Sequence, residues 1–291
     1  MTGWFPAVLL RFFISFLMLG VVIPAEARRV LIQAGDISLP AEYRAPTQPR
    51  MPAILMMHGC GGLLTPTGQI SSRMVRVGNL LQEMGYGVLY LDSFTPRGIK
   101  QVCSPGASSG AIAPSIRARD AEAAVSWLRR QKNVDGSRIG VLGWSHGADA
   151  ILSLLGRKNR SIKAAVTYYP SCRSFAKLKK YRVSAPTLVL VGEMDKAAPA
   201  QECKKLAAKT GQDLFHVVTY PEVGHDFDAP VASPSAQNDV PNHARSKDSA
   251  FNEPAVDAAQ DANRRTFKWF SRWFDPERAI QGVPPSSKQG R

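Results

Sequence analysis

The sequence feature that most restricts the fold is a serine between two glycines in residues Gly143–Gly147, which read Gly-Trp-Ser-His-Gly. Residues 137–142 before this segment predict a short buried strand, and residues 148–155 after it predict a helix. A turn of this kind between a strand and a helix strains the serine backbone and exposes the hydroxyl. Its two glycines lie against each other, where side chains would not fit. The context therefore predicts a nucleophilic Ser145 rather than a chance pattern in a glycine-rich turn.

The rest of the chain alternates apolar, strand-like runs with helix-like segments. Two short runs near residues 29–32 and 37–40 predict an antiparallel start. A continuous apolar run, typical of a strand buried on both faces, follows at residues 53–57, and further strands are predicted at residues 87–91, 162–169, 187–191 and 214–220. Helical spacing of apolar residues is found at residues 72–84, 116–130, 199–209 and 255–274. This alternation predicts an α/β fold with a mostly parallel central sheet and helices on both faces.

We expect residues 28–275 to form one domain, because the chain shows no internal repeat and no second pattern of elements. Residues 229–252 are rich in Pro, Ser, Ala and Asn and predict an irregular insertion. Residues 276–291 predict a flexible C-terminal tail. The helix at residues 255–274 closes the domain, and its inner side is expected at Val256, Ala259, Phe267, Phe270 and Trp273.

Residues 1–27 have the features of a signal peptide. Arg11 precedes the apolar run at residues 12–22, and residues 25–27 form an A-x-A cleavage site. The run is short for a membrane span, although an uncleaved anchor is the alternative because Arg11 is the only charge ahead of it. We therefore expect an exported protein, periplasmic or secreted, with no stable membrane span after cleavage.

The cysteines and the net charge fit an exported protein. An even number of cysteines in an oxidising compartment predicts two disulfides, and buried free thiols are the alternative. None of the four cysteines has the C-x-x-C spacing of a zinc or redox site, so no metal is expected. The net charge of +14 is scattered along the sequence without a basic run interleaved with aromatic residues. We therefore expect a solvated basic surface and no nucleic-acid partner.

A serine hydroxyl is a weak nucleophile and needs a base, which an acid must hold in place. Of the five histidines, only His225 follows the last predicted strand on a glycine-containing turn. The acid should follow a strand that lies between serine and histidine in the sequence, where Asp195 stands, with Glu193 as the alternative. The carboxylates directly after the histidine are too close in sequence to turn back onto its ring. The expected triad is Ser145, Asp195 and His225, in the order that this arrangement of elements uses.

An oxyanion formed on the substrate needs two backbone N–H donors. The first is expected from His146, one residue past the serine, and the second from the glycine-rich loop at residues 58–62. Within that loop we favour the N–H of Cys60, with Gly61 as the alternative. We expect the side chain of His58 to brace the loop rather than take part in the chemistry.

Five stretches of the sequence resemble the dienelactone hydrolase family of α/β-hydrolases. They are residues 58–62, 92–98, 143–147, 192–195 and 224–227, and the resemblance extends from about residue 53 to residue 274. It implies the α/β-hydrolase fold and an enzyme that hydrolyses esters or lactones with a nucleophile, an aspartate and a histidine. The founding members use a cysteine nucleophile, whereas this chain has Ser145. That departure favours a general exported carboxylesterase over an enzyme for dienelactones.

Two further expectations follow from the expected fold. Arg97 lies after the strand at residues 87–91, at the same edge of the sheet as Ser145, and is a candidate for binding an acidic substrate. The alternative is a structural arginine that fixes its loop through backbone carbonyls. The usual strand order of α/β-hydrolases places Cys60 near Cys103 and Cys172 near Cys203, so these pairs are the expected disulfides.

Three interpretations of the function compete. The first is a serine hydrolase of small-molecule carboxylic esters or lactones that works through an acyl-enzyme and needs no cofactor. The second is an acyltransferase or peptidase with the same triad. The third is a non-catalytic binding protein on a hydrolase fold, and the intact order of the three residues and the intact glycine-rich loop argue against it.

Overall fold

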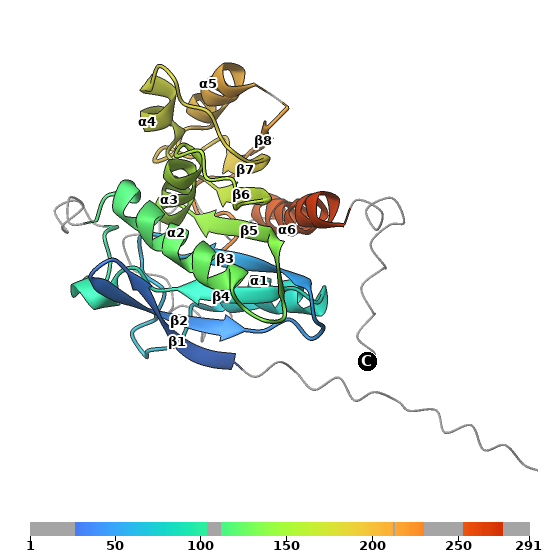
Figure 1. Ribbon diagram of the computed structural model, residues 1–291. Coiled ribbons are helices and arrows are strands. Elements are labelled where there is room, and N and C mark those ends of the chain that lie inside the picture. Colours follow the sequence, from blue (N-terminus) through green and yellow to red (C-terminus); the bar gives the residue numbers. More distant parts are fainter. Residues whose placement is uncertain (1–26, 104–111, 212, 230–252, 276–291) are drawn as a thin grey trace, which may run out of the picture.

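Residues 27–103, 112–211, 213–229 and 253–275 are described in the computed structural model (Figure 1). The predicted signal peptide lies outside the described residues except for Ala27, which begins the first strand. The predicted insertion is described only at Ala229, and the predicted tail, residues 276–291, lies wholly outside. These three predictions therefore stay predictions.

The described residues contain one eight-stranded sheet with the order β1-β2-β4-β3-β5-β6-β7-β8. β1 and β2 form an antiparallel hairpin, β2 pairs antiparallel with β4, and the other neighbours are parallel. The predicted α/β fold with a mostly parallel sheet is confirmed. The strands are β1 (Ala27–Ala34), β2 (Ile37–Arg44), β3 (Met51–Met57), β4 (Gly87–Leu91), β5 (Val134–Trp144), β6 (Ala164–Tyr168), β7 (Thr187–Gly192) and β8 (Phe215–Tyr220).

Helices cover both faces of the sheet. Successive residues of each strand point to opposite faces, so one strand contributes side chains to two apolar clusters. On β3, for example, Leu55 packs into one apolar cluster and Ile54 into the other. The first cluster contains buried residues of α2 (Pro114–Arg129), α3 (His146–Leu155), α4 (Cys172–Lys177) and α5 (Ala200–Thr210). The second contains those of α1 (Ser72–Glu83) and α6 (Glu253–Phe274). Figure 1 shows α2 and α3 crossing in front of the sheet, with α1 behind it.

The inner side of α6 was predicted only in part. Phe270 is buried as expected, but Val256, Ala259, Phe267 and Trp273 are only half-buried. The buried stripe runs about one position away, through Ala255, Ala258, Ala262, Trp269 and Phe274. The helix has apolar residues on two adjacent faces, and its contact with the sheet selects between them. The sequence pattern alone does not define that contact.

Segments that carry the predicted site residues gather at one edge of the sheet. Parallel strands end at the same edge, and in open α/β sheets ligands bind there. Ser145 directly follows β5, and Asp195 and His225 follow β7 and β8. The loop with Cys60 follows β3, and the 3-10 helix η1 (Thr95–Arg97) follows β4. The fold therefore brings residues from five parts of the chain to one place.

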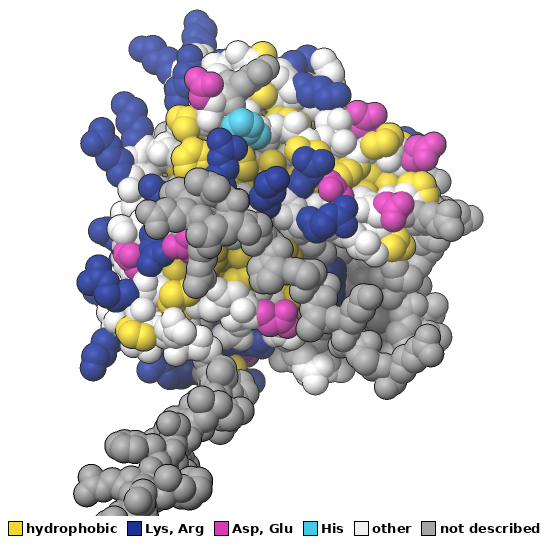
Figure 2. All heavy atoms as spheres, turned by 90° about the vertical axis from the view of Figure 1, so that its right-hand side faces the viewer, with side chains coloured by type: hydrophobic (Ala, Val, Ile, Leu, Met, Phe, Trp, Pro, Cys, Tyr) yellow, Lys and Arg dark blue, Asp and Glu magenta, His cyan; other side chains and the backbone are white. Residues whose placement is uncertain are grey.

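The positive charge is dispersed over the surface. On the face shown in Figure 2, Lys and Arg side chains stand among uncharged side chains and several carboxylates. This distribution fits the expected solvated basic surface. Within the described ranges, no helix has both the length and the apolar character needed to cross a membrane.

Candidate active site

The turn at Ser145 has the strained geometry that the sequence predicts. Ser145 has φ 49° and ψ −119°, a left-handed conformation that is rare for residues other than glycine. A Cβ at Gly143 would lie 2.9 Å from the backbone of Gly147, and a Cβ at Gly147 would collide with the carbonyls of Met57 and His58. Both glycines are therefore needed for the strand, the turn and the neighbouring loop to pack. The turn holds the serine hydroxyl out toward the end of the sheet.

The three residues of the predicted triad form one chain of hydrogen bonds. The Oγ of Ser145 lies 3.1 Å from Nε2 of His225, and Nδ1 of His225 lies 2.7 Å from Oδ2 of Asp195. The other carboxylate oxygen of Asp195 accepts hydrogen bonds from the backbone N–H groups of residues 197 and 198 at 2.9 and 2.7 Å. Asp195 is fully buried as a side chain, so its orientation is fixed. This is the geometry in which a histidine takes a proton from a serine.

The alternative acid, Glu193, faces away from the histidine. Its Oε1 accepts a hydrogen bond from Thr219 at 2.7 Å and pairs with Lys204 at 3.5 Å. Among the other histidines, His216 is exposed on β8 and His243 lies outside the described residues. Of the two candidate acids, Asp195 and not Glu193 is therefore the one that bonds the ring of His225.

The environment of His225 favours its protonated form. Burial alone would lower the pKa of His225, but the hydrogen bond that its ring donates to Asp195 and the charges of Asp226 and Asp195 outweigh burial and raise it. The ring also packs against Tyr169, with centroids 4.5 Å apart. An imidazolium formed during a reaction is thus stabilised where it would form.

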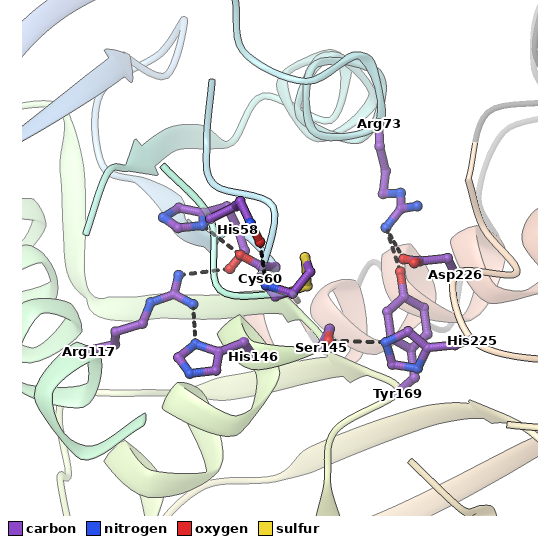
Figure 3. Close-up of a disulfide and its surroundings, with 12 residues drawn as sticks. His58, Cys60, Arg73, Arg117, Ser145, His146, Tyr169, His225 and Asp226 are labelled. Atoms are coloured by element: carbon purple, nitrogen blue, oxygen red, sulfur yellow. Dashed lines mark hydrogen bonds and ion pairs between the residues drawn. A yellow bond between two sulfur atoms is a disulfide. The ribbon is translucent and has the colours of Figure 1, made fainter. Parts of the chain in front are cut away.

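A charged cluster beside the histidine was missed by the sequence analysis. Nη1 of Arg73, on α1, donates to the hydroxyl of Tyr169 at 2.6 Å and to Asp226 at 2.9 Å (Figure 3). The carboxylate of Asp228 accepts hydrogen bonds from Tyr169 and Trp144, both at 2.7 Å. The two carboxylates that follow the histidine thus bind the arginine and the aromatic side chains around it. No local sequence signal links Arg73 to them, because they are about 150 residues apart.

The predicted oxyanion donors belong to two segments next to Ser145, the first turn of α3 and the loop after β3. His146 is the first residue of α3, so its N–H has no acceptor within the helix. Cys60 lies in the loop after β3, where its carbonyl accepts a hydrogen bond from Val102 at 2.8 Å. Gly59, next to Cys60, packs against Ser145, since a Cβ placed there would lie 3.7 Å from the serine Cβ. The roles of Cys60, His146 and the alternative Gly61 stay predictions.

His58 has the bracing geometry that the sequence analysis expects. The residue is 1% exposed, its Nδ1–H donates to the carbonyl of Gly59 at 2.8 Å, and its Nε2 accepts from the N–H of Ser93 at 3.4 Å. Burial, followed by the charge of Arg117, holds the pKa of His58 well below its usual value. The ring is therefore neutral and links the loops after β3 and β4.

A cavity of about 760 Å³ opens beside Ser145. Its walls come mainly from the loop after β3, the start of α1 and the loop after β4. Apolar and glycine residues form much of the lining, including Leu63, Leu64, Pro66, Met74, Phe94 and Ile99. Such a cavity suits a small organic molecule with an apolar part. Among the described residues, no group of three or more His, Cys, Asp or Glu side chains is arranged to hold a metal ion.

Both expected disulfides are present in the structure. Cys60 pairs with Cys103, and Cys172 pairs with Cys203. The pairs join segments that follow neighbouring strands, β3 with β4 and β6 with β7. The first disulfide ties the loop with the predicted oxyanion donor to the segment after β4. Two disulfides are consistent with an exported protein.

Opening the first disulfide is expected to lower turnover beyond any loss of stability. In Cys103→Ser, Cys60 keeps its hydrogen bond with Val102 but loses its covalent tether. If Cys60 is an oxyanion donor, kcat should fall tenfold to a hundredfold, since losing one donor outright typically costs about a hundredfold or more. The measurement is kcat on an ester well below the melting temperature.

The matched control for this prediction is Cys203→Ser, which opens the other disulfide. It should lose stability without a comparable loss of kcat. Wild-type kcat in Cys103→Ser would remove the disulfide from any part in positioning the donor.

Arg97 has the geometry of a bracing residue. Its guanidinium makes two hydrogen bonds of 2.8 Å to the carboxylate of Asp120 and one of 2.6 Å to the carbonyl of Ser93. It is not among the residues that line the cavity. This geometry favours the structural alternative, and the binding of an acidic substrate by Arg97 stays an untested prediction.

Arg97→Met is expected to destabilise the fold by about 3 kcal/mol, because it leaves the Asp120 carboxylate buried without its partner. The double variant Arg97→Met/Asp120→Asn should recover part of that loss in thermal or urea unfolding. Activity of Arg97→Met on neutral and on carboxylate-bearing esters provides the second measurement. A loss confined to the carboxylate-bearing ester would support substrate recognition instead.

Comparison with known proteins gives the same classification at the level of the family. The model of the dienelactone hydrolase family matches residues 39–274. No curated protein matches the chain. Solved structures with the same fold include a Klebsiella pneumoniae protein assigned as a dienelactone hydrolase, with a TM-score of 0.65 and 17% identity. That match covers 85% of this chain and 99% of the other.

Two further structures show what else this fold supports. A dienelactone hydrolase-like promiscuous phosphotriesterase from metagenomic libraries has a TM-score of 0.65 and 21% identity, over 86% of this chain and 98% of its own. A puromycin-hydrolysing peptidase from Mycobacterium tuberculosis has a TM-score of 0.59 and 15% identity. That match covers 86% of this chain but only 40% of the peptidase. At these identities the likeness concerns the fold alone.

Proposed function

Because the chain belongs to the dienelactone hydrolase family, whose model matches residues 39–274, we propose that it is an exported serine hydrolase of carboxylic esters or lactones. The observation that carries the proposal is the chain of hydrogen bonds from Ser145 through His225 to Asp195. Ser145, at one end of this chain, lines a cavity of about 760 Å³. A serine that lines the cavity and has this support is an activated nucleophile. The expected signal peptide and the two disulfides support export.

In the first half of the reaction, Oγ of Ser145 attacks the ester carbonyl and His225 accepts the serine proton at Nε2. Asp195 keeps the histidine in the correct tautomer and stabilises the imidazolium. The negative oxygen of the tetrahedral intermediate accepts hydrogen bonds from the N–H groups of His146 and Cys60. Collapse of the intermediate breaks the bond to the alcohol oxygen, which takes the proton from His225, and leaves an acyl group on Ser145.

In the second half, His225 removes a proton from a water molecule that attacks the acyl-enzyme. The same two N–H groups hold the second oxyanion, and collapse returns the proton to Ser145 as the carboxylic acid leaves. A lactone follows the same steps, but its alcohol remains attached to the acid. Each step uses groups of this chain and water.

Two measurements on the mature protein test the proposal. A fluorophosphonate probe should label Ser145, identified by peptide mass, and p-nitrophenyl esters of increasing chain length should be hydrolysed. Protein that is neither labelled nor active on any ester of the panel would contradict the proposal. Adding alcohols or amines to the assay and analysing the products separates hydrolysis from acyl transfer.

Activity should fall as the pH drops through a value above 6.5, the ordinary pKa of histidine. His225 acts as a base only when it is neutral, and its raised pKa keeps it protonated to a higher pH than an isolated histidine. Asp226→Asn removes one of the charges that raise this pKa, so the acid limb of kcat/KM should move to lower pH. Glu193→Gln, which removes the carboxylate that faces away from the site, should leave the limb where it is. A limb at the same pH in both variants would contradict the assignment.

A further inference from the structure

Arg117, on α2, occupies a position that is costly for an arginine. The residue is 0% exposed, and its Nε is buried without a hydrogen-bond partner among the described residues. Burial lowers the pKa of its guanidinium to about 9, although the charges of Asp120, Asp149 and Asp92 oppose that shift. The group is therefore still charged at neutral pH. Burying such a charge is unfavourable unless its hydrogen bonds are specific and well formed.

The guanidinium directs its hydrogen bonds to two segments at the site. Nη2 donates to the carbonyl of His58 at 2.7 Å, and Nη1 donates to Nδ1 of His146 at 2.9 Å. Figure 3 shows the arginine reaching both segments from one side. His58 begins the loop that carries Cys60, and His146 carries the other predicted oxyanion donor. One side chain thus spans both walls of the predicted oxyanion hole.

The rings around Arg117 hold it in this position. The guanidinium lies 4.8 Å from the ring centroid of Phe94, which also makes an edge contact with His58 at 4.5 Å. The ring of His146 has a pKa lowered to about 4, by burial first and by Arg117 second. A neutral ring that accepts at Nδ1 has its proton on Nε2, and it bonds the backbone of Ile112. The ring of His146 is therefore locked in one tautomer with its acceptor toward Arg117.

We infer that Arg117 is the positioning residue of the oxyanion hole, holding the loop of Cys60 and the first turn of α3 at the separation that an oxyanion requires. The inference rests on the proposed hydrolase function. Arg117 does not touch the substrate in this arrangement, and it acts through the two backbone N–H groups. Its contribution appears in the transition state, where charge develops on the substrate oxygen, and not in the binding of the uncharged ester. This also assigns a use to His58 and His146, which the triad leaves without one.

The variants Arg117→Met and Arg117→Lys test the inference, because a positioning residue should affect kcat and leave KM nearly unchanged. Arg117→Met should lower kcat for a p-nitrophenyl ester tenfold to a hundredfold and change KM by less than about threefold. Affinity for a trifluoromethyl ketone, which adds to Ser145 and places an oxyanion in the same hole, should fall by a similar factor. Arg117→Lys keeps the positive charge and a hydrogen-bond donating group, and it should recover part of both losses.

Arg138→Met is the matched control. Arg138 is a partly buried arginine that bonds Asp135, Asp275 and the carbonyl of Arg50, none of which lines the cavity. It should lose stability without losing kcat or ketone affinity. Arg117→Met with wild-type kcat, or with a loss entirely in KM, would overturn the inference while leaving an active wild type and the proposed function intact.

His146→Ala provides a second test should Arg117→Met fail to fold. It removes the ring that accepts from Arg117 but keeps the backbone N–H of residue 146. A drop in kcat and in ketone affinity, with KM little changed, is expected, and wild-type values of both would overturn the inference. An unlabelled, inactive wild type would overturn the proposed function and this inference together.

Discussion

Replacing Ser145 by alanine should abolish ester hydrolysis and leave the fold intact. Loss of a triad serine costs on the order of a millionfold in turnover. The serine Oγ contacts His225, and its removal leaves no cavity in the apolar core. Alanine has the same Cβ as serine, so it adds no new strain at φ 49°. The measurements are kcat for a p-nitrophenyl ester and the thermal unfolding midpoint.

Ser153→Ala is the matched control for this prediction, because Ser153 lies on α3, the helix that Ser145 directly precedes, and is also half-buried. It should keep wild-type turnover and stability. Retention of more than a tenth of wild-type activity in Ser145→Ala would remove Ser145 from the role of nucleophile.

Replacing His225 by alanine should cost about as much, on the order of a millionfold in turnover. Without the ring, Ser145 has no base within hydrogen-bond distance, and the buried Asp195 loses the partner that lies 2.7 Å away. Labelling by a fluorophosphonate probe should slow in parallel, because it needs the same activated serine. The double variant Ser145→Ala/His225→Ala should be no worse than either single variant, since the residues act as a unit.

His216→Ala is the control for this second variant. The ring of His216 is exposed and packs at the edge of Trp269, with centroids 5.1 Å apart. Its loss should leave turnover unchanged, and so should His243→Ala, which falls outside the described residues. Activity that survives in His225→Ala but disappears in His216→Ala would reverse the assignment.

The site residues that the sequence predicts have a signal either in a short motif or in their order relative to the strands. Ser145 lies in a short motif between a strand and a helix, and its geometry depends on glycines within the same five residues. Asp195 and His225 are predicted from their order relative to the strands, which is a property of the topology. The pairs of cysteines followed from strand neighbours in the same way. Such features survive small errors in the bounds of elements.

Residues whose role depends on distant partners were not found. Arg73 and Arg117 lie on helices whose apolar spacing is all that the sequence shows, and their acceptors belong to other segments. Asp226 was set aside because a neighbour in sequence does not reach back onto the ring of His225. The structure gives Asp226 φ 59°, and its carboxylate pairs with Arg73. Its effect on the histidine is exerted through charge, which a pattern of residues does not reveal.

The close packing of Gly147 against the backbone of residues 57 and 58 limits where substitutions can change the substrate specificity. A side chain at that position would collide with the carbonyls of Met57 and His58, so the turn at Ser145 and the start of the loop after β3 tolerate little change. The cavity lining also includes ordinary apolar side chains, namely those of Leu63, Leu64 and Ile99. Substitutions at these three positions should therefore change the substrate preference, while the turn at Ser145 stays unchanged. A library confined to those three positions would sample ester selectivity at little risk to the chemistry.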